Sequence, residues 1–140
     1  MSVLPPLIST PMRIIEHPMG DIFHGMKASD LGYAGFGEAY FTTIINGEIK
    51  GWKQHTKMVM NLVVPIGMVR FYVHDSIKNS TSVYEIGISN YCRLTIPPGY
   101  WVAFEGRTSY TNLVLNLASL EHDPMEAVNQ PLDTYPLASL

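Results

Sequence analysis

Lys53 and His55 are the two residues of this sequence that are best placed to do chemistry together. They lie two positions apart in a run that favours extended backbone, and alternate side chains of a β-strand point to the same face. An imidazole can accept a proton near neutral pH, and a neighbouring ammonium group can stabilise negative charge on a substrate. The pair therefore predicts proton transfer in one pocket. The ordinary alternatives are a hydrogen-bonded barrel histidine and a lysine on a solvated face.

Two more polar side chains share a face on the strand that precedes this run. Glu38 and Tyr40 are also two positions apart, so we expect both to line the mouth of the same pocket. The alternative for Tyr40 is an aromatic side chain at the edge of the core. Asn46-Gly47 lies between the two runs and is a strong hairpin signal, because both residues tolerate positive φ.

Short apolar segments separated by turn residues recur along most of the chain. Such regular spacing predicts an all-β sandwich or barrel, and no long apolar stripe with helical spacing competes with it. The expected strands cover 33–45, 48–52, 58–64, 68–74, 82–88, 93–96, 100–104 and 110–117. Three prolines predict an extended arm over residues 1–15, and three more predict an irregular tail over 118–140. We expect residues 1–140 to form one domain.

Composition and charge exclude several classes of function. The chain is 46% hydrophobic and 15% charged, but no apolar run approaches the roughly 18 residues of a membrane helix, so we expect a soluble protein without a membrane partner. The formal charge is −3 and there is no basic block, which argues against nucleic-acid binding. Cys92 is the only cysteine, and the N-terminus lacks the pattern of a signal peptide. We therefore expect a cytoplasmic location.

An ordered set of short motifs resembles a known family. The motifs are Lys50-Gly51-Trp52-Lys53, Gly67, Asp75, Ser80-x-Ser82, Asn90 and Ile96-Pro97-Pro98-Gly99-Tyr100. In this order and spacing, over about residues 35 to 135, they resemble the dTDP-4-dehydrorhamnose 3,5-epimerase family of nucleotide-sugar cupins. The resemblance implies an all-β, single-domain cupin, which is a double-stranded β-helix or jelly-roll barrel.

The resemblance also implies roles for particular residues. In the family, a histidine supported by a carboxylate removes a proton next to a sugar 4-keto group, and a tyrosine returns a proton from the opposite face. The base position corresponds to Lys53, the tyrosine position lies close to Leu115, and a second family histidine corresponds to Val102. Lys53 and His55 are thus the expected replacement for the base.

Other positions complete the expected site. Asp133 corresponds to the supporting carboxylate, and Lys50 replaces a phosphate-binding arginine. The tyrosines expected to replace the acid are Tyr40, Tyr72 and Tyr110. The catalytic set is therefore His55, Lys53 and Asp133, and the substrate-binding set is Lys50, Glu38, Tyr40 and Tyr110.

A metal site is not expected. A metallocupin uses His-x-His, then a glutamate, then a last histidine, and of these four only His55 is present, beside a lysine that would repel a divalent cation. This disfavours a metal-dependent dioxygenase. The leading hypothesis is a cofactor-free epimerase or isomerase of a nucleotide-activated 4-keto-6-deoxy sugar, similar to a dTDP-sugar. The alternative is a cupin that binds a sugar or sugar nucleotide without catalysis. By analogy, we expect a homodimer formed by exchange of the N-terminal arm.

Overall fold

Antiparallel β-strands make up nearly all of the regular structure in the computed structural model, which describes residues 3–137. The strands are β1 (Ile8–Pro11), β2 (Ile14–Ile15), β3 (Ile22–Phe23), β4 (Glu38–Thr43), β5 (Ile49–His55), β6 (Met60–Ile66), β7 (Met68–Asp75), β8 (Ser80–Gly87), β9 (Cys92–Ile96), β10 (Trp101–Gly106), β11 (Leu113–Ala118) and β12 (Ala127–Asn129). A 3₁₀ turn, η1, covers Leu132–Thr134. Within residues 3–137 no helix is long and apolar enough to span a membrane.

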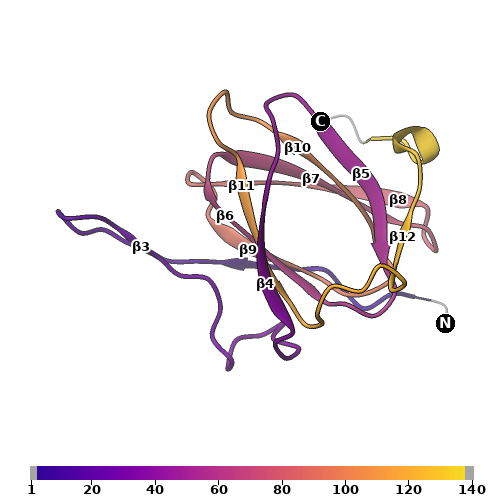
Figure 1. Cartoon of the computed structure of the whole chain (residues 1–140), viewed down its shortest axis with the longest axis horizontal. Coiled ribbons are helices and arrows are strands. Elements are labelled where there is room, and N and C mark those ends of the chain that lie inside the picture. The colour runs from indigo at the N-terminus through magenta and orange to yellow at the C-terminus, as the bar shows by residue number, and fades with distance from the viewer. Residues whose placement is uncertain (1–2, 138–140) are drawn as a thin grey trace.

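Two five-stranded sheets form the barrel. One has the order β1-β9-β6-β11-β4 and the other the order β12-β5-β10-β7-β8, while β2 and β3 form a separate hairpin that projects from the barrel (Figure 1). Sequence-distant strands are neighbours in both sheets, as in a jelly roll. The all-β jelly-roll prediction is therefore confirmed.

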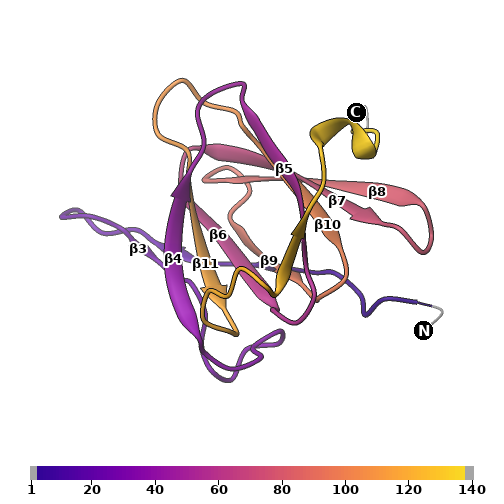
Figure 2. The same cartoon turned by 45° about the vertical axis from the view of Figure 1, so that its right-hand side comes forward.

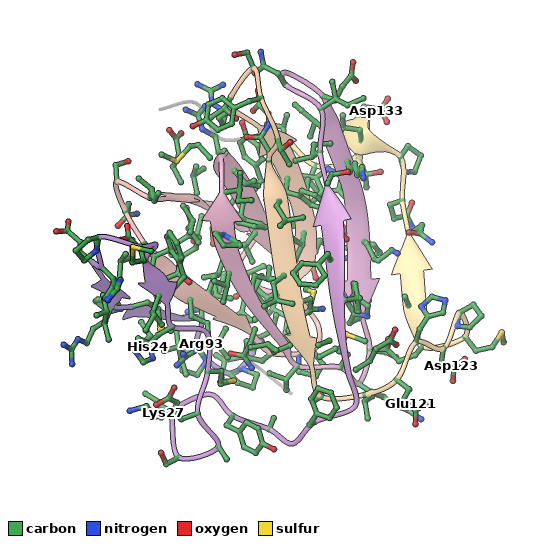
Figure 3. All side chains as sticks on the ribbon, turned by 60° about the vertical axis from the view of Figure 1, so that its left-hand side comes forward. His24, Lys27, Arg93, Glu121, Asp123 and Asp133 are labelled. Carbon is green, nitrogen blue, oxygen red and sulfur yellow. The ribbon has the colours of Figure 1, made fainter. Side chains whose placement is uncertain are left out.

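The core lies between the two sheets and follows the alternation of the strands. Its members are apolar side chains from the inner faces, among them Met60, Leu62, Val64, Val69, Phe71, Val73, Leu94, Ile96, Val102 and Val114. Strand β9 is buried on both faces, because the loop over residues 24–32 covers its outer side. There the fully buried Arg93 donates hydrogen bonds to the carbonyl of Gly25 and to Asp30, and Figure 3 shows it beside His24 and Lys27.

The C-terminal segment contains more regular structure than the irregular tail expected over 118–140. Strand β12 pairs with β5, and η1 follows it across the outer face of the second sheet. There the Trp52 indole N–H donates to the carbonyl of Leu132 at 2.9 Å, and the Tyr135 ring stacks on His74 with 4.0 Å between centroids. These contacts hold residues 131–137 against the barrel. Residues 138–140 lie outside the described part.

The N-terminal segment is extended, as its prolines predict. Strand β1 pairs with β9 of the same chain, with Ile8 opposite Thr95 and Pro11 opposite Cys92. The Tyr100 hydroxyl donates to the carbonyl of Pro5, which fixes the start of the segment. Residues 1 and 2 of the expected arm lie outside the described part.

A seam separates the two sheets where β4 and β12 are the edge strands (Figure 2). Within residues 3–137 no backbone ladder joins β4 to β12 or to β5. The loop over 44–48 crosses between the sheets at one end of the seam, and the loop over 119–126 crosses at the other. Strands β4 and β5 are therefore not paired with each other.

Candidate active site in the barrel

A cavity of about 420 Å³ lies between the sheets along this seam. Its wall is mostly apolar, with polar side chains gathered on β4, β5 and β11. The lining residues are Tyr40, Thr42, Lys50, Gly51, Trp52, Lys53, His55, Met60, Leu62, Phe71, Val102, Phe104, Val114, Asn116, Asn129 and Gln130. A concave apolar site with a few convergent polar groups is the usual form of a small-molecule site.

A bulge in β5 turns three cationic or basic side chains toward this cavity. On the neighbouring strand, Val102 is opposite Lys53 and Phe104 is opposite Lys50, so two residues of β5 face one of β10. Without the bulge, residues three apart would point to opposite faces. With it, Lys50, Lys53 and His55 all line the cavity.

Glycine is required at the bulge because the strands approach closely. A Cβ atom at Gly51 would lie 2.5 Å from the Cβ and 2.8 Å from the Cα of Ala103. Real Cβ atoms do not come so near to backbone atoms, so any larger residue would push β5 away from β10.

His55 is held by a buried carboxylate, Glu126. The His55 Nδ1 atom lies 2.7 Å from Glu126 Oε1, and both side chains are nearly inaccessible to solvent. Glu126 Oε2 accepts the backbone N–H groups of Lys57 and Met58, each at 2.9 Å. Burial raises the pKa of Glu126, but these hydrogen bonds outweigh burial and lower the pKa to about 2. Glu126 is therefore ionised at neutral pH.

The ionised carboxylate determines which nitrogen of His55 can react. A carboxylate only accepts hydrogen bonds, so Nδ1 must carry the hydrogen that points at Glu126. In the neutral imidazole, Nε2 then keeps its lone pair and can accept a proton from a substrate. His55 is thus arranged as a general base.

Tyr40 comes from the facing sheet and lines the same cavity. Its hydroxyl oxygen lies 2.9 Å from Nδ2 of Asn116, which is directly opposite it on β11. Of the other two tyrosines considered as acids, Tyr72 donates to Glu105 at 2.7 Å, and Tyr110 is 67% exposed; neither lines the cavity. Of the three, Tyr40 alone lines the cavity, and it does so from the sheet opposite that of His55.

A second cavity of about 320 Å³ adjoins the first. Tyr40, Lys53 and His55 line both cavities, so they stand at the junction. The remaining lining residues of the second cavity are Glu38, His122, Asp123, Glu126 and Ala127. The backbone N–H of His122 donates to Glu38 Oε1 at 2.9 Å, which ties Glu38 to the loop over 119–126.

Lys50 lies at the other end of the first cavity, near the Asn46-Gly47 turn. Its Nζ donates to the carbonyl of Thr43 at 2.7 Å and lies 5.8 Å from the centre of the Phe104 ring. These contacts hold the ammonium group at the cavity wall while the side chain stays exposed.

Asp133 does not lie with these residues. It is exposed on η1, and Figure 3 shows it at the far end of the C-terminal segment from Glu121 and Asp123. The carboxylate that contacts His55 is Glu126, seven positions earlier. The sequence signal for Glu126 was weak, because its position depends on the three-residue strand β12, where Ala127 pairs with His55.

Two positions implied by the family resemblance carry apolar side chains here. Val102 is buried and lines the cavity, whereas Leu115 on β11 alternates with the inward-facing Val114 and Asn116. Among residues 3–137 no group of three or more His, Cys, Asp or Glu side chains lies close enough together to hold a metal ion.

Solved structures similar to this chain include an isomerase, a ketoisomerase and an epimerase. A dTDP-sugar isomerase from Desulfovibrio desulfuricans G20 is 25% identical with a TM-score of 0.88, over 95% of this chain and 88% of the other. A variant of the 3,4-ketoisomerase QdtA from Thermoanaerobacterium thermosaccharolyticum, solved with TDP-4-keto-6-deoxyglucose, is 18% identical with a TM-score of 0.76, over 89% and 88%. The 3'-monoepimerase ChmJ from Streptomyces bikiniensis, solved with dTDP-quinovose, is 15% identical with a TM-score of 0.79, over 95% and 79%.

No protein-family model matches the chain, and no curated protein sequence matches it. The similarity found is one of three-dimensional structure, at low sequence identity. The chain has a cupin-like jelly-roll fold, and its structure resembles those of dTDP-sugar isomerases and epimerases.

Proposed function

We propose that this protein is a cofactor-free epimerase or isomerase of a nucleotide-activated 4-keto-6-deoxy sugar. The observation that carries the proposal is the buried His55–Glu126 pair, which faces Tyr40 across a cavity that Lys53 also lines. A base, a cation and a hydroxyl on the facing wall are the groups that proton transfer next to a ketone requires. Structural neighbours named as dTDP-sugar isomerases and epimerases support the same substrate class.

The first step removes a proton from the carbon next to the 4-keto group. His55 Nε2 takes the proton, the carbon–hydrogen bond breaks, and its electron pair forms the enolate with the negative charge on the former keto oxygen. Lys53 stabilises that oxygen by its charge and by a hydrogen bond. Glu126 stabilises the imidazolium that forms, because its carboxylate is ionised and fixed by two backbone N–H groups.

The second step returns a proton to the enolate. If the Tyr40 hydroxyl gives the proton to the same carbon from the opposite face, the configuration inverts; Tyr40 and His55 then regain their starting states through solvent. If instead the hydroxyl proton on that carbon moves to the former keto oxygen and the imidazolium returns its proton to the former keto carbon, the first carbon becomes the ketone and the keto group has migrated. Both outcomes use the same base and the same enolate, so they form one class of chemistry.

The charges around the two cavities favour one orientation of the substrate. A diphosphate is attracted to the end of the first cavity that holds Lys50, and it is repelled by Glu38 and Asp123 in the second cavity. The sugar ring then lies at the junction, where Tyr40, Lys53 and His55 meet. Glu38 can accept hydrogen bonds from sugar hydroxyl groups there.

The proposal includes a homodimer in which N-terminal arms are exchanged. Two features support it. Strand β1 is held to β9 through one short ladder, and the adjoining β2–β3 hairpin projects from the barrel with Met19 89% exposed and Ile22 55% exposed. The same β1–β9 ladder can form with the arm of a second copy.

The test is solvent-proton exchange followed by NMR in D₂O with dTDP-4-keto-6-deoxyglucose. We expect deuterium to enter a carbon next to the keto group, and His55→Ala to slow this exchange about 10²-fold or more. Asp133→Asn is the control and should exchange at the wild-type rate. If the wild type binds the sugar nucleotide, seen as a rise in Tm, without exchanging any proton, the protein is the non-catalytic sugar-nucleotide-binding cupin instead.

A further inference from the structure

The side chain of Asn116 occupies an unusual position, because it is an amide in a wall of apolar residues. It is 3% exposed, lies on β11 between Tyr40 on β4 and Leu62 on β6, and points into the cavity with Val114. Burying an amide is unfavourable unless its polar atoms find partners. The identity of those partners determines what Asn116 does.

The backbone of β6 fixes the orientation of the Asn116 amide. The backbone N–H of Asn61 lies 3.1 Å from the Asn116 side chain, and an N–H group can only donate, so the atom it meets is Oδ1. The NH₂ group therefore faces the other way. One of its hydrogens points to the Tyr40 hydroxyl at 2.9 Å, and Met58 Sδ lies 3.8 Å from the same nitrogen.

We propose that Asn116 is a positioning residue that turns the hydroxyl hydrogen of Tyr40 into the cavity. A tyrosine hydroxyl can donate one hydrogen bond and also accept, and its hydrogen rotates to suit its partners. Because Asn116 occupies the oxygen as a donor, the hydrogen of Tyr40 cannot point back at Asn116. It is left for the substrate, on the wall that faces His55. This inference rests on the proposed function.

The two ends of Asn116 thus have different consequences. Its Oδ1 satisfies a backbone group of β6, which any acceptor at this place would do. Its Nδ2 sets the direction of the Tyr40 hydrogen bond, which only a donor can do. Asn116→Asp has nearly the same shape and separates these roles, because a carboxylate still accepts from Asn61 but would accept the Tyr40 hydrogen as well.

The experiment measures two rates with the wild type and each variant, using dTDP-4-keto-6-deoxyglucose in D₂O: deuterium entry and inversion at the exchanging carbon. Deuterium entry needs His55, whereas inversion also needs a proton from the facing wall. We expect Asn116→Asp to keep deuterium entry within about threefold and to lower inversion about 10²-fold. Tyr40→Phe should show the same split. Asn79→Asp, in the exposed β7–β8 turn, is the matched control and should change neither rate.

The outcomes separate the inference from the proposed function. An unchanged ratio of inversion to exchange in Asn116→Asp and Tyr40→Phe overturns the inference, and so does a wild type that exchanges without inverting; both leave the proposed function intact. If the wild type exchanges no proton, the proposed function fails. The hydrogen bond is then still tested by the side-chain NH₂ resonances of Asn116 in Tyr40→Phe: a shift of one resonance supports the contact, and unchanged resonances overturn it. The same NMR comparison decides the case if Asn116→Asp does not fold.

Discussion

The Glu126 carboxylate forms hydrogen bonds with three groups at once. One oxygen meets the His55 imidazole, and the other accepts the backbone N–H groups of Lys57 and Met58 at the start of the turn into β6. A single side chain therefore fixes the tautomer of the base and ties β12 to the β5–β6 turn. Its removal should affect both stability and reaction.

Stability at acid pH should depend on Glu126. Its pKa falls from an ordinary 4.5 to about 2, so the ionised form stabilises the fold above pH 4.5, and this contribution is lost as the pH falls toward 2. The shift corresponds to about 3 kcal/mol. We expect Glu126→Gln to be less stable at pH 7 by about this amount and to show a flatter dependence between pH 4.5 and 2, measured by urea unfolding. If Glu126→Gln lost stability between pH 4.5 and 2 as steeply as the wild type, this role of Glu126 would be contradicted. Asp133→Asn is the control and should show the pH dependence of the wild type.

Lys50 should contribute to binding rather than to the reaction. It lies at the end of the cavity remote from the His55–Glu126 pair, where we place the diphosphate. Lys50→Ala should therefore raise KM about tenfold, with kcat changed less than twofold, as is typical of lost ground-state binding. Steady-state kinetics with the dTDP-sugar measure both. A fall in kcat with unchanged KM would place Lys50 at the reacting carbon instead.

How much of the site could be predicted from the sequence differs between residues. Strand alternation was sufficient to predict that Lys53 and His55 share a face, and that Glu38 and Tyr40 do; each pair lines a common cavity. Glu126 could not be found this way, because its partner His55 is 71 residues away and meets it only through tertiary structure. Asp133 and Tyr110, both exposed, are not among the residues that line either cavity.

Among the elements, β5 depends most on a local irregularity. The bulge at Gly51 and Trp52 brings Lys50 onto the face of Lys53, and the close approach of Ala103 leaves no room for a side chain at Gly51. The side chain of the adjoining Trp52 is buried on the outer side of the sheet, where its indole N–H donates to the carbonyl of Leu132. A substitution at the bulge should therefore change both the stability of the fold and the shape of the cavity.

Gly51→Ala tests the bulge. The added methyl group must displace Ala103 and with it β10, so we expect a loss of stability of about 2–4 kcal/mol and a lower affinity for the sugar nucleotide. Gly25→Ala is the matched control, because a Cβ there would meet only Leu117 Cδ1 at 3.9 Å. Thermal unfolding and ligand titration measure the two effects. Equal stability of both variants would show that the bulge tolerates a side chain.

Element boundaries were predictable where strands are long and apolar, and less so elsewhere. The expected strand over 68–74 is β7 at Met68–Asp75, whereas the expected strand over 33–45 is shorter, as β4 at Glu38–Thr43. Strand β12 has three residues and no alternation to detect, so its pairing with β5 is visible only in three dimensions. The all-β class needed only the recurring pattern of strands and turns.

For the molecule as a whole, the N-terminal arm determines what happens to one edge of the first sheet. Strand β1 covers β9, so removing residues 1–12 exposes the edge of β9. If arms are exchanged in a homodimer, we expect this deletion to convert the dimer to monomer in size-exclusion chromatography with light scattering. A truncated protein that remains dimeric would rule out arm exchange as the basis of assembly.

The seam between β4 and the β5–β12 edge determines where a bound ligand should restrict the motion of the barrel. Within the described residues no backbone ladder joins β4 to β5 or β12, so a ligand that touches Tyr40 and Lys53 would add a link between these two edges of the barrel. We expect a bound sugar nucleotide to slow hydrogen–deuterium exchange of backbone amides in β4 most of all. Product release would then break these contacts, and the motion of β4 would be one of the steps that affect turnover.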